Sequence, residues 1–124
     1  MFKKLVTIVT AMLGLGSCST GIENVDVPQF AGLLSDTVQL VDVRTPDEYA
    51  AGHLEGAVLI DVKSSNFEEQ AAAQLDKRRP VAVYCRSGRR SLAAAKLLKR
   101  AGYRVTNLKG GILAWEAAGQ RVVK

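Results

Sequence analysis

Short apolar runs alternate with amphipathic segments along most of the chain. Four runs have the length and composition of buried strands, and the segments between them carry apolar residues at helical spacing. The expected strands span residues 37–43, 57–60, 81–84 and 104–108. Because strands and helices alternate, the pattern predicts an α/β domain with a mainly parallel sheet and helices on both faces.

Capping residues set several of the expected helix starts. A polar residue followed three positions later by Glu or Gln is typical of a capping box. Pairs with this spacing are Asp26 and Gln29, Thr45 and Glu48, and Ser65 and Glu68. Pro46 and Gly52 delimit one short helix over residues 46–51. The helix that begins near residue 66 is expected to close with Lys77-Arg78-Arg79 and to end at Pro80.

Two further helices follow in the second half of the chain. The helix expected over residues 91–102 ends at Gly102, and its apolar residues share one face. This stripe consists of Ala94, Leu97, Leu98 and Ala101. The last helix is expected over residues 112–118 after a turn at Gly110-Gly111 that could also contribute to the rim of a site. We expect its residues Ile112, Leu113 and Trp115 to pack in the core.

Residues 1–17 have the pattern of a secretion signal. Lys3 and Lys4 precede an apolar segment, residues 5–15, that is too short to span a bilayer. Leu15-Gly16-Ser17-Cys18 is similar to the bacterial lipobox, which implies that Cys18 is acylated and becomes the mature N-terminus. An ordinary signal peptide or a buried N-terminal helix is the alternative.

The lipobox hypothesis predicts the domain organisation and the cellular location of the protein. We expect a lipoprotein-type signal peptide over 1–17, a tether over 18–22 and one domain over 23–124. The protein would be exported and anchored in a membrane by its lipid alone, at the periplasmic or extracellular face. Ser19 favours the outer membrane if the organism is diderm.

Composition narrows the class of protein further. The chain has 124 residues, of which 48% are hydrophobic and 23% charged, as in a single globular domain. Cleavage before Cys18 leaves 107 residues and lowers the net charge from +5 to +3. The remaining basic residues alternate with acidic ones without an aromatic pattern, so we expect no nucleic-acid partner.

The strongest chemical signal is the segment Cys85-Arg86-Ser87-Gly88-Arg89-Arg90-Ser91, which lies between an expected strand and an expected helix. Helix N-termini and nearby cations lower the pKa of a thiol, and the thiolate is the nucleophile. Gly88 permits a tight turn whose amides could surround an anion. If Cys18 carries the lipid, Cys85 is a lone thiol. Attack on a sulfane sulfur would give a persulfide that the same amides stabilise. The alternative is a buried, inert cysteine beside a basic turn.

Three ordered segments resemble the signatures of the rhodanese sulfurtransferases. They are Cys85 to Ser91; Val41 to Tyr49 with Gly52 to Ala57; and Leu108 to Trp115. The resemblance covers most of the mature chain and implies a rhodanese-like fold with a five-stranded sheet. It extends to the small periplasmic rhodaneses of the phage-shock type, from which a lipid anchor would be a departure.

The resemblance also implies roles for individual residues. Cys85 would carry the persulfide inside a cradle formed by residues 85–90, with Arg86 and Arg90 as the main contacts to the substrate anion. The expected substrate-binding set is Arg86, Ser87, Gly88, Arg89, Arg90 and Ser91. Asp42 and Arg44, at the carboxyl end of another expected strand, would sit nearby and form an ion pair that orders the rim.

Spacing separates sulfur chemistry from phosphate chemistry. Phosphatases with a thiolate loop follow a Cys-x5-Arg pattern, whereas position 91 here is Ser91 and Arg90 comes one residue early. His53 is the only histidine, and its place in a turn suggests a structural donor. One histidine and no CxxC give no metal-ligand spacing, and no nucleotide-binding glycine motif is present, so we expect no cofactor.

We therefore expect a monomeric sulfurtransferase that moves sulfur from a small sulfur-containing anion, such as thiosulfate, to a thiophilic acceptor, cyanide or a thiol. A persulfide carrier or thiol sensor that binds a partner protein and turns over poorly is the alternative. It needs the same activated thiol. A phosphatase is the weakest reading.

Overall fold

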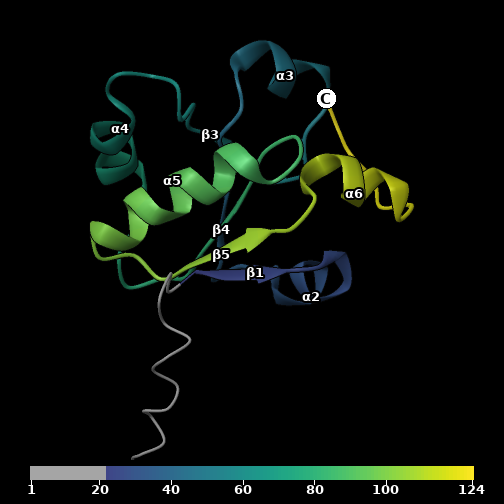
Figure 1. Ribbon diagram of the computed structural model, residues 1–124, viewed down its shortest axis with the longest axis horizontal. Coiled ribbons are helices and arrows are strands. Elements are labelled where there is room, and N and C mark those ends of the chain that lie inside the picture. Colours follow the sequence, from purple (N-terminus) through teal and green to yellow (C-terminus); the bar gives the residue numbers. More distant parts are fainter. Residues whose placement is uncertain (1–21) are drawn as a thin grey trace, which may run out of the picture.

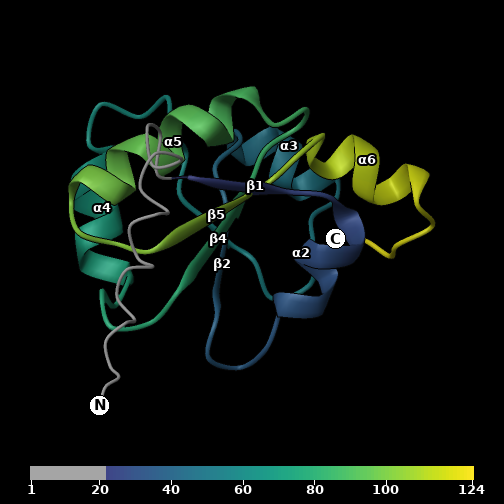
Figure 2. The same ribbon diagram turned by 60° about the horizontal axis from the view of Figure 1, so that its bottom comes forward.

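Residues 22–124 are described by the computed structural model and form one five-stranded sheet with helices on both faces (Figure 1; Figure 2). The strand order is β1-β5-β4-β2-β3, and every neighbouring pair is parallel. The expected α/β fold is confirmed, and the sheet is entirely rather than mainly parallel. The predicted signal peptide, Cys18 and the tether up to residue 21 lie outside the described residues.

From residue 26 onward, helices and strands alternate in the order that the sequence predicts. The strands are β1 (Glu23–Val25), β2 (Gln39–Asp42), β3 (Val58–Leu59), β4 (Val81–Tyr84) and β5 (Val105–Leu108). The helices are α2 (Val27–Leu33), α3 (Pro46–Ala51), α4 (Phe67–Gln74), α5 (Arg89–Arg100) and α6 (Gly111–Ala117). No helix among residues 22–124 is both long and apolar enough to cross a bilayer.

The core is divided by the sheet into two clusters. Along β4, Val81 and Val83 pack with residues of α4 and α5, while Ala82 and Tyr84 pack with residues of α2 and α6. This alternation follows from the two-residue repeat of a strand, and both faces are apolar because helices cover both (Figure 2). All residues of both clusters lie within the described part of the chain.

Two predicted helix starts are confirmed by their hydrogen bonds. Asp26 accepts a hydrogen bond from the Gln29 amide at 3.1 Å and begins α2. Thr45 accepts one from the Glu48 amide while the Glu48 carboxylate accepts from Thr45 N, so the capping box of α3 is complete. Gly52 follows α3 with φ of 154°, as expected of its terminator.

The predicted start of α4 is wrong. The N-cap is Asn66 rather than Ser65, and its side chain makes no capping hydrogen bond. Instead the side-chain amide of Gln70 donates from Nε2 to Asn66 Oδ1 at 2.6 Å and to Ser64 Oγ at 3.2 Å. These side-chain bonds replace the expected capping box.

The predicted end of α4 is also wrong. The helix ends at Gln74, so Lys77-Arg78-Arg79 forms a loop and not a helix C-terminus. The buried side chain of Gln39 on β2 holds this loop, since it accepts from Asp76 N at 2.8 Å and donates to the carbonyls of Asp76 and Arg79. A tertiary contact therefore ends the helix earlier than the local pattern predicts.

Three apolar positions differ from expectation. Ala101 is exposed, and Ala95 is buried in its place on α5. Leu113 is 44% exposed, whereas Ile112 and Trp115 are buried as predicted. Ile22, the expected last tether residue, packs against the core.

The strand β1 was not among the predicted strands. It has only three residues, two of them exposed, and it lacks an apolar run. Its place comes from pairing with β5, where Glu23, Asn24 and Val25 lie beside Thr106, Asn107 and Leu108. The family resemblance implied five strands, and β1 is the fifth.

Candidate active site

Cys85 lies directly after β4 at the carboxyl edge of the sheet, where parallel α/β sheets place their sites. Its side chain is 1% exposed. The Gly88 amide donates to Cys85 Sγ at 3.1 Å and the Ser91 hydroxyl at 3.3 Å. Gly88 is the N-cap of α5 with φ of 101°, a left-handed conformation that glycine adopts without strain. The segment predicted as a cradle therefore closes around the sulfur.

The surroundings of Cys85 favour its ionised form. Burial raises the pKa of the thiol, but hydrogen bonds from the Ser91 hydroxyl and from the amides of Ser91, Gly88 and Ser87 outweigh it and lower the pKa from its ordinary value. A net lowering in a buried position requires donors aimed at the sulfur. The site thus shifts the thiol toward its ionised form without a neighbouring base.

The start of α6 fixes the other side of this loop. The Ile112 amide donates to Cys85 O at 2.9 Å, and the Leu113 amide donates to Arg86 O at 3.2 Å. A Cβ on Gly111 would lie 2.3 Å from Arg86 O, so only glycine fits there. The predicted turn at Gly110-Gly111 is confirmed and contacts the loop directly.

A buried polar network stands beside the loop. The Arg44 guanidinium donates to both carboxylate oxygens of Asp42, with the shortest contact 2.7 Å, and to Gly52 O at 2.6 Å. The Tyr84 hydroxyl donates to Asp42 Oδ2 at 2.6 Å and accepts from Leu54 N at 3.0 Å. Burial and the Asp42 carboxylate raise the pKa of Tyr84, which keeps the phenol protonated. The expected ion pair between Asp42 and Arg44 is present and organises this rim.

The loop arginines differ in their surroundings. Arg90 forms a two-pronged ion pair with Glu48, at 2.8 and 2.9 Å, and its side chain is only 26% exposed. It is therefore a partly buried helix residue rather than a free loop cation. Arg86 and Arg89 are exposed.

Arg86 borders a hollow of about 230 Å³ beside the loop. The hollow is lined by Arg44, Glu48, Ala51, Gly52, Arg86, Ile112, Leu113 and Glu116. Arg44 is committed to Asp42, so Arg86 is the cation in this lining that faces solvent. Of the two arginines predicted to contact the anion, Arg86 is exposed to solvent and Arg90 is paired with Glu48.

The remaining predicted residues have structural surroundings. His53 stacks on the Tyr49 ring at 3.7 Å, and its Nδ1 lies 2.9 Å from Tyr49 O. Trp115 packs edge-on against Phe30 and donates its indole N–H to Arg121 O. In the part of the chain that the structure describes, no group of three acidic, His or Cys side chains is arranged to hold a metal ion.

Sequence reasoning missed three contributors to the site. Glu48 was assigned only to a helix cap, although its carboxylate also binds Arg90. Tyr84 was assigned only to a strand, although its hydroxyl supports Asp42. Asn107 on β5, 1% exposed, donates to Gly88 O at 3.3 Å and so supports the loop from the far side. Asn107 could have been suspected from the sequence, because it is a polar residue within a predicted buried strand.

Comparison with known proteins places this geometry in a family. The sequence matches the rhodanese-like domain over residues 26–118. It is 40% identical to thiosulfate sulfurtransferase 18 of Arabidopsis thaliana over 106 residues, which cover 76% of this chain and 78% of that one. It is 39% identical to a sulfurtransferase of Allochromatium vinosum, with 82% of this chain and 95% of that one covered.

A solved structure agrees with the fold. The rhodanese-related protein of Thermoplasma volcanium superposes with a TM-score of 0.73 and 27% identity, covering 82% of this chain and 97% of that one. The match therefore spans nearly the whole of that solved chain. The loop around Cys85, the all-parallel sheet and these relatives agree that the chain belongs to the rhodanese-like family, whose members named here include sulfurtransferases.

Proposed function

We propose that the protein is a thiosulfate sulfurtransferase that works through a Cys85 persulfide. The observation that carries this proposal is the buried thiol whose pKa is lowered by the Ser91 hydroxyl and the loop amides. Two relatives, 40% and 39% identical to this chain, are named sulfurtransferases, and the first is named a thiosulfate sulfurtransferase.

In the first half-reaction, the Cys85 thiolate attacks the outer sulfur of thiosulfate. A bond forms between Sγ and that sulfur while the sulfur–sulfur bond of thiosulfate breaks, and its electron pair leaves with sulfite. The product is Cys85–S–S⁻, which carries the negative charge one atom further from the backbone. Donors fixed before the reaction stabilise such an anion without reorganisation.

In the second half-reaction, an acceptor removes the outer sulfur. Cyanide attacks it to give thiocyanate, or a thiolate attacks it to give a new persulfide, and the Cys85 thiolate is restored in both cases. Each step exchanges one bond to sulfur for another, so no external oxidant or reductant is needed. The scheme is ping-pong, as expected for covalent catalysis.

The loop supports sulfur rather than phosphoryl transfer. The residue six positions after Cys85 is Ser91, whose hydroxyl donates a hydrogen bond to Cys85 Sγ at 3.3 Å. The arginine one position before Ser91, Arg90, is already paired with Glu48. A tetrahedral phosphate would therefore lack the guanidinium that a Cys-x5-Arg loop supplies.

Steady-state turnover with thiosulfate and cyanide tests the proposal. We expect measurable thiocyanate production that is lost in Cys85→Ser. Intact mass of the wild-type protein after thiosulfate treatment should show one added sulfur, removable by cyanide. A stable persulfide without turnover would identify a carrier, and Cys85-dependent hydrolysis of an aryl phosphate would identify a phosphatase; either result overturns the proposal.

Arg86 is proposed as the contact to the anionic donor. Arg86→Ala should raise KM for thiosulfate about ten-fold, the effect of losing one charge-assisted contact, with a smaller change for a neutral acceptor. Arg100→Ala is the matched control, because Arg100 is an exposed arginine at the opposite end of α5. Equal effects of the two substitutions would refute a specific role for Arg86.

We also propose that the protein is exported and lipid-anchored at Cys18, as the first 18 residues of the sequence suggest. It would face the periplasm or the cell exterior, at the outer membrane in a diderm organism. We further propose that the protein acts as a monomer.

A further inference from the structure

One surface of the domain carries six cationic side chains and takes no part in the site around Cys85. It lies at the amino edge of the sheet, where β4 and β5 begin and α5 ends. Its cations are Lys77, Arg78 and Arg79 before β4, Lys99 and Arg100 at the end of α5, and Arg104 before β5. All six side chains are exposed. We call these six residues the amino-edge surface.

Contacts between these segments show that they form one surface. The Arg104 guanidinium donates to Arg78 O at 3.0 Å, and Lys77 lies over the Tyr103 ring, 5.6 Å from its centre. The Arg79 guanidinium donates to the carbonyls of Thr37 and Asp36 in the loop before β2. The three loops and the end of α5 are therefore packed side by side.

The surface is basic after its acidic neighbours are counted. Four carboxylates adjoin these cations. Asp36 and Asp76 lie in the contacting loops, Glu23 lines a hollow with Lys99 and Arg104, and Glu68 lines another with Lys77, so two of the six positive charges remain uncompensated. Asp76 pairs with Arg78 at 3.0 Å, but the Arg78 side chain is 90% exposed. Helix-dipole stabilisation accounts for cations at the end of α5, but not for the four in loops.

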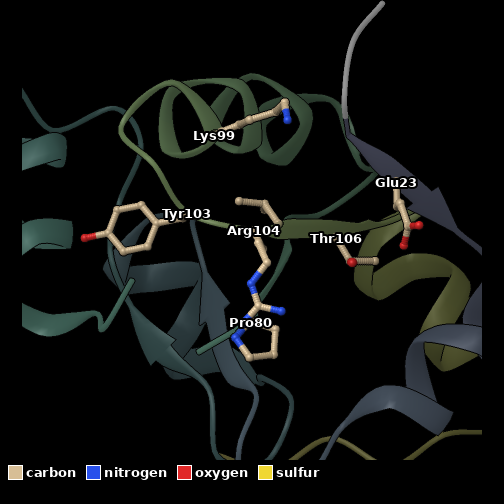
Figure 3. Close-up of a pocket in the computed structure, with 7 residues that line it drawn as sticks. Glu23, Pro80, Lys99, Tyr103, Arg104 and Thr106 are labelled. Carbon is tan, nitrogen blue, oxygen red and sulfur yellow. The ribbon is translucent and has the colours of Figure 1, made fainter. Parts of the chain in front are cut away.

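A hollow of about 390 Å³ opens in this surface. Figure 3 shows Lys99 on α5 beside it, Arg104 extending toward Pro80, and Glu23 on the β1 side. The hollow is wide enough for a small phosphate-bearing group, and two of its lining side chains are cations. Its chemistry suits an anionic headgroup.

The chain enters the domain at the same edge. Ile22 precedes β1, whose first residue, Glu23, borders the hollow. Four peptide units separate Cys18 from Ile22 and span at most about 14 Å. A lipid on Cys18 would therefore hold this edge within one to two Debye lengths of the bilayer at physiological ionic strength.

We propose that the amino-edge surface lies against anionic phospholipid headgroups and so orients the domain on the membrane. Cys85 follows the opposite end of β4, about 13 Å away along a four-residue strand, and α5 separates the two ends by about 18 Å. The active loop would then point away from the bilayer, toward soluble donors and acceptors. The inference rests on the proposed anchor for its geometry, but the affinity for anionic lipid can be measured without it.

Vesicle co-sedimentation of residues 19–124 tests the proposal, because this fragment contains the whole core and lacks Cys18 and the apolar segment. We expect binding to phosphatidylglycerol-containing vesicles at about 0.01 M ionic strength, weakening at about 0.15 M. Vesicles of phosphatidylcholine alone should not bind. Equal binding to both compositions would overturn the proposal, and so would tighter binding to duplex DNA under the same conditions.

A charge-removal pair locates the binding surface. Lys99→Gln with Arg100→Gln should weaken binding to anionic vesicles about five-fold for each charge removed. Lys63→Gln with Lys124→Gln removes the same charge from exposed residues outside the amino-edge surface and is the matched control. Equal weakening by the two pairs would overturn the location, and thermal unfolding of each variant would show that the fold is retained.

Alkylation of Cys85 tests the orientation. Cys85 is the single cysteine of residues 19–124, so the rate of its reaction with a small alkylating reagent reports on this one thiol. Saturating anionic vesicles should leave the rate unchanged. A marked fall in the rate would place the active loop against the membrane and overturn the proposed orientation. Loss of membrane attachment in a Cys18 variant, tested separately, bears on the anchor and not on this surface.

Discussion

At the scale of single residues, hydrogen-bond donors are the main features that lower the pKa of the Cys85 thiol. Burial alone would raise the pKa of the thiol, and the hydroxyl and amides around it reverse that effect. Among these donors, Ser91 supplies the one side-chain hydroxyl that contacts Sγ in the described residues. Its removal separates the side-chain contribution from that of the backbone.

Ser91→Ala should raise the pKa of Cys85, because it removes a hydrogen bond to the ionised sulfur. Because the thiolate is the reactive form, the acidic limb of the kcat/KM profile should move to higher pH. Ser87→Ala is the control, since the Ser87 backbone amide, which lowers the pKa, is retained. Rates of thiol alkylation across pH measure both values directly, and identical profiles would rule out the role assigned to the Ser91 hydroxyl.

Tyr84 supports the rim through one buried hydroxyl. Tyr84→Phe would leave Leu54 N and Asp42 Oδ2 each without a partner that the native protein provides. We expect the free energy of unfolding to fall by about 2 kcal/mol, measured by urea denaturation. Tyr49→Phe, which removes a half-buried hydroxyl bonded to Ala57 O, should cost less. A smaller effect at Tyr84 than at Tyr49 would contradict this ranking.

At the scale of elements, Glu48 joins α3 to α5. It completes the capping box of α3 and pairs with Arg90 on α5. The hydrogen bond from Arg90 is the largest cause that lowers the pKa of Glu48 from 4.5 to about 2. One carboxylate therefore sets both a helix start and the orientation of a helix that carries the active loop.

This linkage predicts a pH-dependent contribution to stability. The carboxylate is ionised in the unfolded chain above pH 4.5, so its full contribution is present above that value and is lost as pH falls toward about 2. Glu48→Gln should lower the free energy of unfolding by about 1 to 2 kcal/mol at neutral pH, with little difference from wild type at the acid end. Asp47→Asn in the same helical turn is the control. A deficit that does not shrink on acidification would contradict the linkage.

Gly111 joins α6 to the active loop by close approach of backbones. Gly111→Ala would place a methyl group 2.3 Å from Arg86 O at φ of +63° and should displace the loop. Gly119→Ala introduces the same backbone strain, at φ of +82°, with no atom within 4 Å. We expect both to lose about 1 kcal/mol from strain, and Gly111→Ala to lose at least as much again together with most of its turnover. Equal stability and activity of the two variants would mean that the loop tolerates the contact.

The sequence predicted those elements whose boundaries are set locally. The helix over 46–51 has its cap, proline and glycine within eight residues, and all three act as expected. The end of α4 depends on Gln39, which is distant in sequence, so Lys77-Arg78-Arg79 was assigned wrongly to a helix. The strand β1 depends on β5 in the same way. Local sequence signals were enough to locate most helices and strands, whereas the end of α4 and the strand β1 depend on contacts with residues distant in sequence.

At the scale of the whole molecule, the two proposed sites lie at opposite edges of the parallel sheet. Asp42 ends β2 and Cys85 follows β4, and both lie at the carboxyl ends of parallel strands, so the sequence alone could place them on one rim. It could not show that Arg90 is already paired with Glu48, because nothing local links residues 42 positions apart. The opposite edge carries the amino-edge surface and the entry of the chain. Because the two edges are opposite, a partner bound at the amino-edge surface would not cover the loop around Cys85.

The proposed anchor predicts where the whole protein is found in the cell. Cys18→Ser should move it from the membrane pellet to the soluble fraction, because acylation requires the cysteine thiol. Ser19→Ala is the matched control and should stay in the pellet. Fractionation at high ionic strength removes the contribution of the amino-edge surface, since screening shortens the Debye length to about 3 Å at 1 M salt. A Cys18→Ser protein that stays in the pellet under these conditions would indicate an uncleaved apolar segment over residues 5–15 rather than a lipid.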